Sequence, residues 1–97
     1  MPEFVLLCRD KKDGLDLRLA TRDAHLAYVG NAKIEILLAG PILDGGDNPA
    51  GSLFIINAEN EPAVRVFTEN DPYSKAGLFE SADIWPYRMV AGKLMAQ

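Results

Sequence analysis

The densest cluster of turn-forming residues in this 97-residue chain, Asp44–Pro49, lies between two strand-like segments. The first, Lys33–Leu38, alternates polar and apolar residues and then stays apolar as far as Gly40-Pro41. The second, Gly51–Ala58, is a mostly apolar run with two isoleucines. Glycine, proline, asparagine and aspartate at the junction favour a reversal of the chain. The sequence therefore predicts a β-hairpin and, with it, an antiparallel sheet.

A strand and a helix are predicted before the hairpin. Phe4–Cys8 is a short apolar run with the length of a buried strand. Over Asp16–Val29, apolar residues recur at helical spacing, and Asp13 or Asp16 can cap the first turn. The charged segment Arg9–Asp13 between these elements is interpreted as a solvated turn.

A second helix and a last strand are predicted after the hairpin. Asn60, followed by a proline two residues later, opens a second helix. This helix is predicted to end at Asp71, because Pro72 disfavours the helical conformation in the residue before it. Ala82–Val90 is the last strand, and Pro86 within it indicates a sheet edge or a bulge. The resulting order, β-α-β-β-α-β, predicts an α+β, ferredoxin-like fold with one antiparallel sheet and both helices on one face.

The second face of such a sheet would be uncovered in a monomer. At this length we expect one domain, residues 1–97, which buries only about 60–65 % of the surface that its unfolded chain exposes. Val5 and Leu7 point away from the face on which Phe4, Leu6 and Cys8 lie, so both faces are apolar. We therefore expect a homodimer joined sheet to sheet.

Charge and cysteine content restrict the partners and the compartment. Ten Lys and Arg against fourteen Asp and Glu give a net charge of −4, without the basic stripe that nucleic acid binding requires. The single cysteine, Cys8, cannot form an internal disulfide and is expected to be a buried packing residue. The first residues lack a signal-peptide pattern, and no apolar run is long enough to cross a bilayer. These features predict a cytoplasmic protein that binds neither membrane nor nucleic acid.

Common ligand motifs are incomplete. Gly40–Gly45 has the glycine spacing of a phosphate loop, but Gly46 stands where lysine is required. One histidine and one cysteine in the whole chain argue against a zinc site within one subunit. We therefore expect no cofactor and no metal.

The residues that could carry chemistry are His25 and Asp71. His25 lies on the first predicted helix, with Arg18 and Arg22 at i−7 and i−3 on the same stripe. It is either an imidazole poised as a proton carrier or part of a solvated helix face. Asp71 either only terminates a helix or is a fixed carboxylate that orients the imidazole.

The remaining candidates are aromatic and hydroxyl groups. Ser52 is either an ordinary turn hydroxyl or a group that binds substrate. Tyr73 is either packing or part of a binding cleft, and Trp85 and Tyr87 have the same two interpretations.

Three short segments carry a specific set of residues. They are R-L-A-T-R-D-A-H-L over Arg18–Leu26, Ala39-Gly40-Pro41 followed by Gly51-Ser52, and D-P-Y-S-K-A-G-L-F over Asp71–Phe79. This set, which spans nearly the whole chain, resembles the YciI-like (YCII-related) family. The resemblance implies a dimeric α/β barrel of the kind shared with muconolactone isomerase-like proteins. It also implies an active-site pair of histidine and aspartate, here His25 and Asp71. Most members have no established substrate, and a few relatives eliminate chloride from chlorinated hydroxyquinols.

Two functions remain open. The first is a cofactor-free lyase or isomerase acting by proton transfer on a small aromatic or lactone substrate. In it His25 is the base or acid, Asp71 accepts a hydrogen bond from the other ring nitrogen, and Arg22 and Arg18 hold an anionic or phenolate substrate. The second is a non-catalytic dimeric module that binds a small ligand or a partner, with the same pair as a structural hydrogen bond. Both predict the two side chains within about 2.6–3.2 Å of each other. They differ in whether the pair faces an open cavity.

Overall fold

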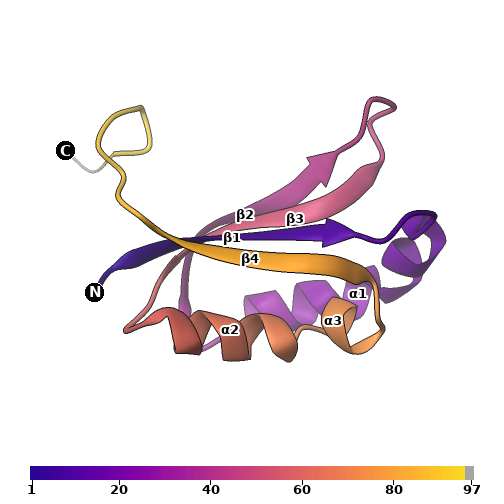
Figure 1. The fold of residues 1–97 in the computed structure, drawn as a ribbon, viewed down its shortest axis with the longest axis horizontal. Helices are drawn as coiled ribbons and strands as arrows, with labels where there is room; N and C mark the ends of the chain where they lie inside the picture. The colour runs from indigo at the N-terminus through magenta and orange to yellow at the C-terminus, as the bar shows by residue number, and fades with distance from the viewer. Residues whose placement is uncertain (96–97) are drawn as a thin grey trace.

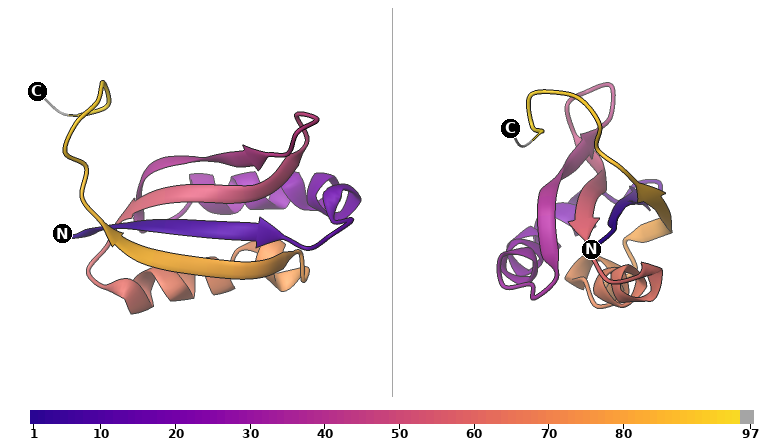
Figure 2. Two further views of the ribbon diagram at one scale, coloured as in Figure 1. Left: turned by 45° about the horizontal axis from the view of Figure 1, so that its top comes forward. Right: turned by 90° about the vertical axis from the view of Figure 1, so that its left-hand side faces the viewer.

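The protein consists of one antiparallel sheet with its helices packed on a single face (Figures 1 and 2). The structure is a computed structural model that describes residues 1–95. Its elements are β1 Glu3–Asp10, α1 Leu15–Gly30, β2 Glu35–Leu43, β3 Pro49–Asn57, α2 Glu61–Glu69, α3 Pro72–Lys75 and β4 Phe79–Tyr87. The strand order is β2-β3-β1-β4, and each neighbouring pair is antiparallel. The predicted ferredoxin-like fold is confirmed. Within residues 1–95, no helix has the length and apolar character that crossing a bilayer requires.

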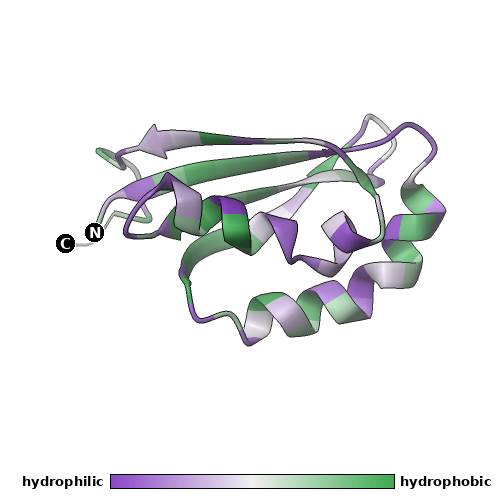
Figure 3. Cartoon of the chain, turned by 60° about the horizontal axis from the view of Figure 1, so that its bottom comes forward, coloured by the Kyte–Doolittle hydropathy of each residue, from purple (hydrophilic) through white to green (hydrophobic). Residues whose placement is uncertain are grey.

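The core lies between the sheet and the helices. Phe4, Leu6 and Cys8 of β1 are buried there, next to Phe54 and Ile56 of β3. Hydrophobic and hydrophilic residues alternate around the helices that cover this face (Figure 3). Cys8 is a packing residue, as predicted, because its side chain is sealed in the core, where burial raises the pKa of the thiol to about 11.

The first helix has a different start from the one predicted. Gly14 occupies the N-cap position of α1, and no side chain caps the helix, so the predicted cap by Asp13 or Asp16 is wrong. A Cβ atom on Gly14 would lie 2.8 Å from Leu78 Cδ1 and 2.9 Å from the Lys11 carbonyl oxygen. The chain passes too close to its neighbours there for a residue with a capping side chain.

The second predicted helix is divided in two. Asn60 caps α2 as expected, because its Oδ1 accepts a hydrogen bond from the Ala63 N–H at 3.0 Å. The helix ends at Glu69 rather than at Asp71, and a short helix, α3, begins at Pro72 with Asp71 as its N-cap. Four residues make barely one turn, so they leave no periodic pattern in the sequence.

Each edge strand of the sheet contains a proline. Pro86 is in β4 and Pro41 is in β2, so the prediction that Pro86 marks an edge is confirmed. β4 begins and ends three residues earlier than the predicted Ala82–Val90. Its pairing with β1 ends at Tyr87 opposite Glu3, where β1 begins, so the described residues 88–95 have no strand beside them.

Candidate active site

His25 and Asp71 meet where α1 passes the start of α3. The Nδ1 atom of His25 lies 2.9 Å from Asp71 Oδ1 and 3.0 Å from Oδ2, so the predicted hydrogen bond is present. Asp71 Oδ1 also accepts a hydrogen bond from the Tyr73 N–H at 2.9 Å, which fixes the carboxylate. Because an ionised carboxylate can only accept, Nδ1 carries the hydrogen and Nε2 of the neutral ring keeps its lone pair.

The two members of this pair differ in access. Asp71 is 1 % exposed and His25 is 9 % exposed. Within residues 1–95, the side-chain nitrogen and oxygen atoms that are buried and lack a hydrogen bond are limited to one, Asn57 Oδ1. His25 Nε2 makes no hydrogen bond to the described residues and is not a buried atom of this kind, so solvent reaches it. The imidazole thus has one nitrogen sealed against Asp71 and the other open.

A cavity of about 280 Å³ lies beside the imidazole, between α1 and the β2–β3 hairpin. Its walls are mostly apolar. Its polar and charged lining residues are Arg18, Arg22, His25, Ser52 and Tyr73. His25, both arginines, Ser52 and Tyr73 from the sequence analysis therefore line one cavity, and Asp71 lies behind His25.

Arg18 is held at the base of this cavity by Asp10. Its Nε donates to Asp10 Oδ2 at 2.6 Å and its Nη2 to Oδ1 at 2.9 Å, and both side chains are 4 % exposed. Burial alone would lower the pKa of Arg18, but the hydrogen bond and charge of Asp10 outweigh it, so the pKa is raised. The solvated-face interpretation is therefore wrong for Arg18 and His25. It holds for Arg22, which is exposed and has no ion-pair partner within residues 1–95.

Asp10 is the site residue that sequence reasoning missed, since Arg9–Asp13 was interpreted as a solvated turn. A usable signal was present in the period-two pattern of β1. Phe4, Leu6 and Cys8 occupy the core face, and the next position in that alternation is Asp10. A carboxylate at that place needs a buried cation, and Arg18 supplies it.

Tyr73 fixes the plane of the imidazole. The two rings are stacked with centroids 4.1 Å apart and an interplanar angle of 19°. The Cζ atom of Arg18 lies 4.4 Å from the centre of the same tyrosine ring. Arg18 and His25 are about two turns apart on α1, roughly 10.5 Å along its axis, which is the room that an inserted ring requires. Burial raises the pKa of the Tyr73 hydroxyl, although Arg18 acts in the opposite direction.

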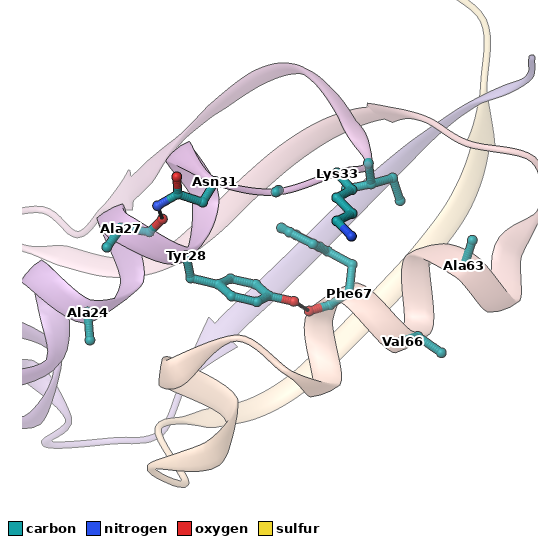
Figure 4. Close-up of a pocket in the computed structure, with 10 residues that line it drawn as sticks. Ala24, Ala27, Tyr28, Asn31, Lys33, Ala63, Val66 and Phe67 are labelled. Carbon is teal, nitrogen blue, oxygen red and sulfur yellow. Dashed lines mark hydrogen bonds between the residues drawn. The ribbon is translucent and has the colours of Figure 1, made fainter.

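Two other regions do not contribute to this site. Trp85 and Tyr87 are 50 % and 42 % exposed and line no part of the cavity beside His25. A larger hollow of about 620 Å³ lies between α1 and α2 (Figure 4). Tyr28 and Phe67 stack at its base, and it contains none of the candidate residues from the sequence.

Comparison with known proteins identifies the family of this chain. The family model described as the YCII-related domain matches residues 2–88. The chain belongs to the YCII-related family. Proteins named YciI from Escherichia coli O6:H1 and Shigella flexneri are each 35 % identical to it over 95 residues, covering 90 % of this chain and 97 % of theirs. An uncharacterized protein from Haemophilus influenzae is 32 % identical over 96 residues with the same coverage.

Solved structures extend the comparison to an enzyme. This chain is similar to 5-chloro-2-hydroxyhydroquinone dehydrochlorinase (TftG) from Burkholderia phenoliruptrix AC1100, whose structure was solved in complex with 2,5-dihydroxybenzoquinone. The TM-score is 0.81 and the identity 35 %, over 94 % of this chain and 96 % of that one. An antibiotic biosynthesis monooxygenase, at 12 % identity and a TM-score of 0.56, shares the fold alone.

Proposed function

We propose that this chain is a small cofactor-free enzyme, a lyase or isomerase that moves a proton on a small hydroxylated or carbonyl-bearing substrate. The observation that carries the proposal is the His25 imidazole, whose Nδ1 is bonded to a sealed carboxylate while Nε2 reaches solvent at a cavity. A base needs this arrangement, because the orienting group must not compete with the substrate. The similarity to a dehydrochlorinase acting on a one-ring substrate supports this choice.

In the proposed reaction, His25 Nε2 accepts a proton from a hydroxyl group or from carbon next to a carbonyl. The electron pair of the broken bond stays on the substrate as a phenolate or enolate. Asp71 stabilises the imidazolium, and the exposed cation of Arg22 attracts an anionic substrate to the mouth of the cavity. On a chlorinated ring, the imidazolium returns the proton to the carbon that bears chlorine. Loss of a second hydroxyl proton to His25 then forms a carbonyl group as chloride leaves with the electrons of the C–Cl bond, so the net loss is HCl. Positioned acid–base groups contribute about 10²–10⁴-fold to such rates.

The test is incubation with 5-chloro-2-hydroxyhydroquinone, its chlorine-free analogue and small lactones in D₂O. We expect chloride release from the first compound, measured with a chloride electrode, or deuterium incorporation into another member of the panel, measured by NMR. Binding of panel members without either reaction would refute the enzyme. It would favour the non-catalytic ligand-binding module, in which the His25–Asp71 hydrogen bond is structural.

We also propose that the protein is a homodimer joined through the face of the sheet that carries no helix. Alternation along β1 directs Val5 and Leu7 to this face, with Ile55 and Leu53 opposite them on β3. Trp85, opposite Val5 on β4, is half exposed. Val5, Leu7, Leu53 and Trp85 are partly exposed, whereas Ile55 is only 9 % exposed. The partly exposed residues form an apolar surface on a small chain, which favours a second copy over solvent.

The dimer is expected to depend on Leu7. Light scattering of the parent protein should give twice the chain mass of 10.6 kDa, and Leu7→Lys should give a monomer. The lysine can pair with Asp83 directly opposite on β4, so the monomer should remain folded. Leu19→Lys, at an exposed leucine on α1, is the matched control and should stay dimeric. A parent that scatters as a monomer at micromolar concentration would contradict the proposal.

A further inference from the structure

Arg18 and Ser52 line the same cavity as His25 and are bonded to each other. We infer that two of their donors, Arg18 Nη1–H and Ser52 Oγ–H, form a site that binds a substrate oxygen as it becomes anionic. This inference rests on the proposed function and deepens it, because it selects substrates that generate an oxyanion, such as phenols and enolisable ketones.

The direction of the Ser52 hydroxyl follows from its partner. A guanidinium group has donors only, so in the 3.0 Å contact Arg18 Nη2 donates and Ser52 Oγ accepts. The hydroxyl hydrogen must therefore point elsewhere. Ser52 makes no second hydrogen bond within residues 1–95, is 3 % exposed and lines the cavity. Its hydrogen is thus left for an occupant of the cavity.

The free donor of Arg18 is identified by elimination. Nε donates to Asp10 and Nη2 to Asp10 and Ser52. Nη1 makes no hydrogen bond of good geometry within the described chain, although the nearby Tyr73 hydroxyl contributes to raising the pKa of Arg18. If Nη1 were buried without a partner, it would be a buried polar atom with no hydrogen bond. Within residues 1–95, that condition applies to Asn57 Oδ1 and not to Arg18 Nη1. Nη1 therefore has access to solvent, and the surface that Arg18 offers is at the cavity.

The pair is fixed before any substrate arrives. The two hydrogen bonds that Arg18 donates to Asp10 and the contact with the Tyr73 ring hold the guanidinium plane in place. Donors held in this way stabilise developing charge without reorganising, and they act more strongly in a partly dry site than in water. Asp10 is accordingly a positioning residue. Arg22 differs, because it is exposed and salt screens its charge.

The inference can be tested without a substrate by binding 4-nitrophenol, whose ionised form absorbs visible light. Titration across pH in about 1 M sodium chloride, where the screening length is about 3 Å, removes most of the contribution of Arg22. We expect the parent to bind the phenolate more tightly than the phenol. Ser52→Ala should lower the phenolate affinity about tenfold or more while changing the phenol affinity little, since hydrogen bonds to charged groups are the stronger ones.

Two further variants separate this site from other sources of anion binding. Ser81→Ala, a matched serine on β4 outside the cavity, should bind the phenolate like the parent. His25→Asn should keep the phenolate preference. The inference is overturned if the parent does not prefer the phenolate, or if Ser52→Ala keeps the full preference. It is also overturned if the preference disappears in His25→Asn, because the imidazolium would then be the binding group. A retained preference without turnover of any compound in the panel would refute proton transfer and leave the anion site in place.

Discussion

Replacing His25 with asparagine is expected to lower turnover of any substrate by about 10²–10⁴-fold while leaving the fold intact. The asparagine amide nitrogen can take the place of Nδ1 and donate to Asp71, so the buried carboxylate keeps a partner. Nothing then replaces Nε2 at the cavity. The measurements are kcat for chloride release or deuterium exchange, and a thermal melt followed by circular dichroism. A variant with the turnover of the parent would remove His25 from the reaction.

His25→Ala is the comparison that separates chemistry from stability. From the sequence, the imidazole is expected to contribute little packing, and this expectation is wrong. The ring is 9 % exposed and stacked on Tyr73. The alanine variant also leaves the Asp71 carboxylate without its side-chain donor, which costs about 1–3 kcal/mol. We therefore expect it to melt below the asparagine variant, although both lose turnover to a similar extent.

Asp71→Asn is expected to lower turnover by about 10²-fold or more through the tautomer of His25. The asparagine Oδ1 can still accept from the Tyr73 N–H and cap α3, so we expect only a modest loss of melting temperature. Its amide group must then donate to His25 Nδ1, which places the ring hydrogen on Nε2. The nitrogen that faces the cavity becomes a donor and can no longer accept a proton.

The tautomer can be observed directly. Nitrogen-15 NMR of the single histidine should report hydrogen on Nδ1 in the parent and on Nε2 in Asp71→Asn. A variant with the altered tautomer and undiminished turnover would refute proton abstraction by the neutral ring. Asp71→Ala is the stability control, because it removes both the cap of α3 and the partner of His25.

The long elements of the fold could be predicted from the sequence because their periodic patterns extend over many residues. The helix at Leu15–Gly30 differs from the predicted segment by one residue at each end, and the hairpin strands differ by one to five residues at each end. The helix at Pro72–Lys75 could not be predicted, because a single turn has no period. The start of β4 could not be predicted from the local sequence, because it is set by the pairing of β4 with the end of β1.

The residues that line the cavity could be predicted from the sequence, but Asp10 and the contacts among the site residues could not. His25, Arg18 and Arg22 share a stripe on one helix, and local spacing is enough to group them. The approach of Asp71 to His25 spans 46 positions and came from the family resemblance. The ion pair between Asp10 and Arg18 was missed because the neighbouring charges made Asp10 look solvated. Burial of a charge depends on which face of β1 it occupies, and the turn-like composition concealed that face.

The prolines at the two outer strands limit how copies of this chain can associate. A proline in a paired edge strand directs its missing N–H outward, so an incoming strand meets no donor at Pro41 of β2 or at Pro86 of β4. Growth of the sheet by strand addition, the route to fibrous cross-β aggregates, is hindered at both borders. The apolar sheet face that the helices leave uncovered can therefore be buried between two copies that pack face to face. Addition of further strands at the sheet edges, which would extend the sheet without limit, is disfavoured.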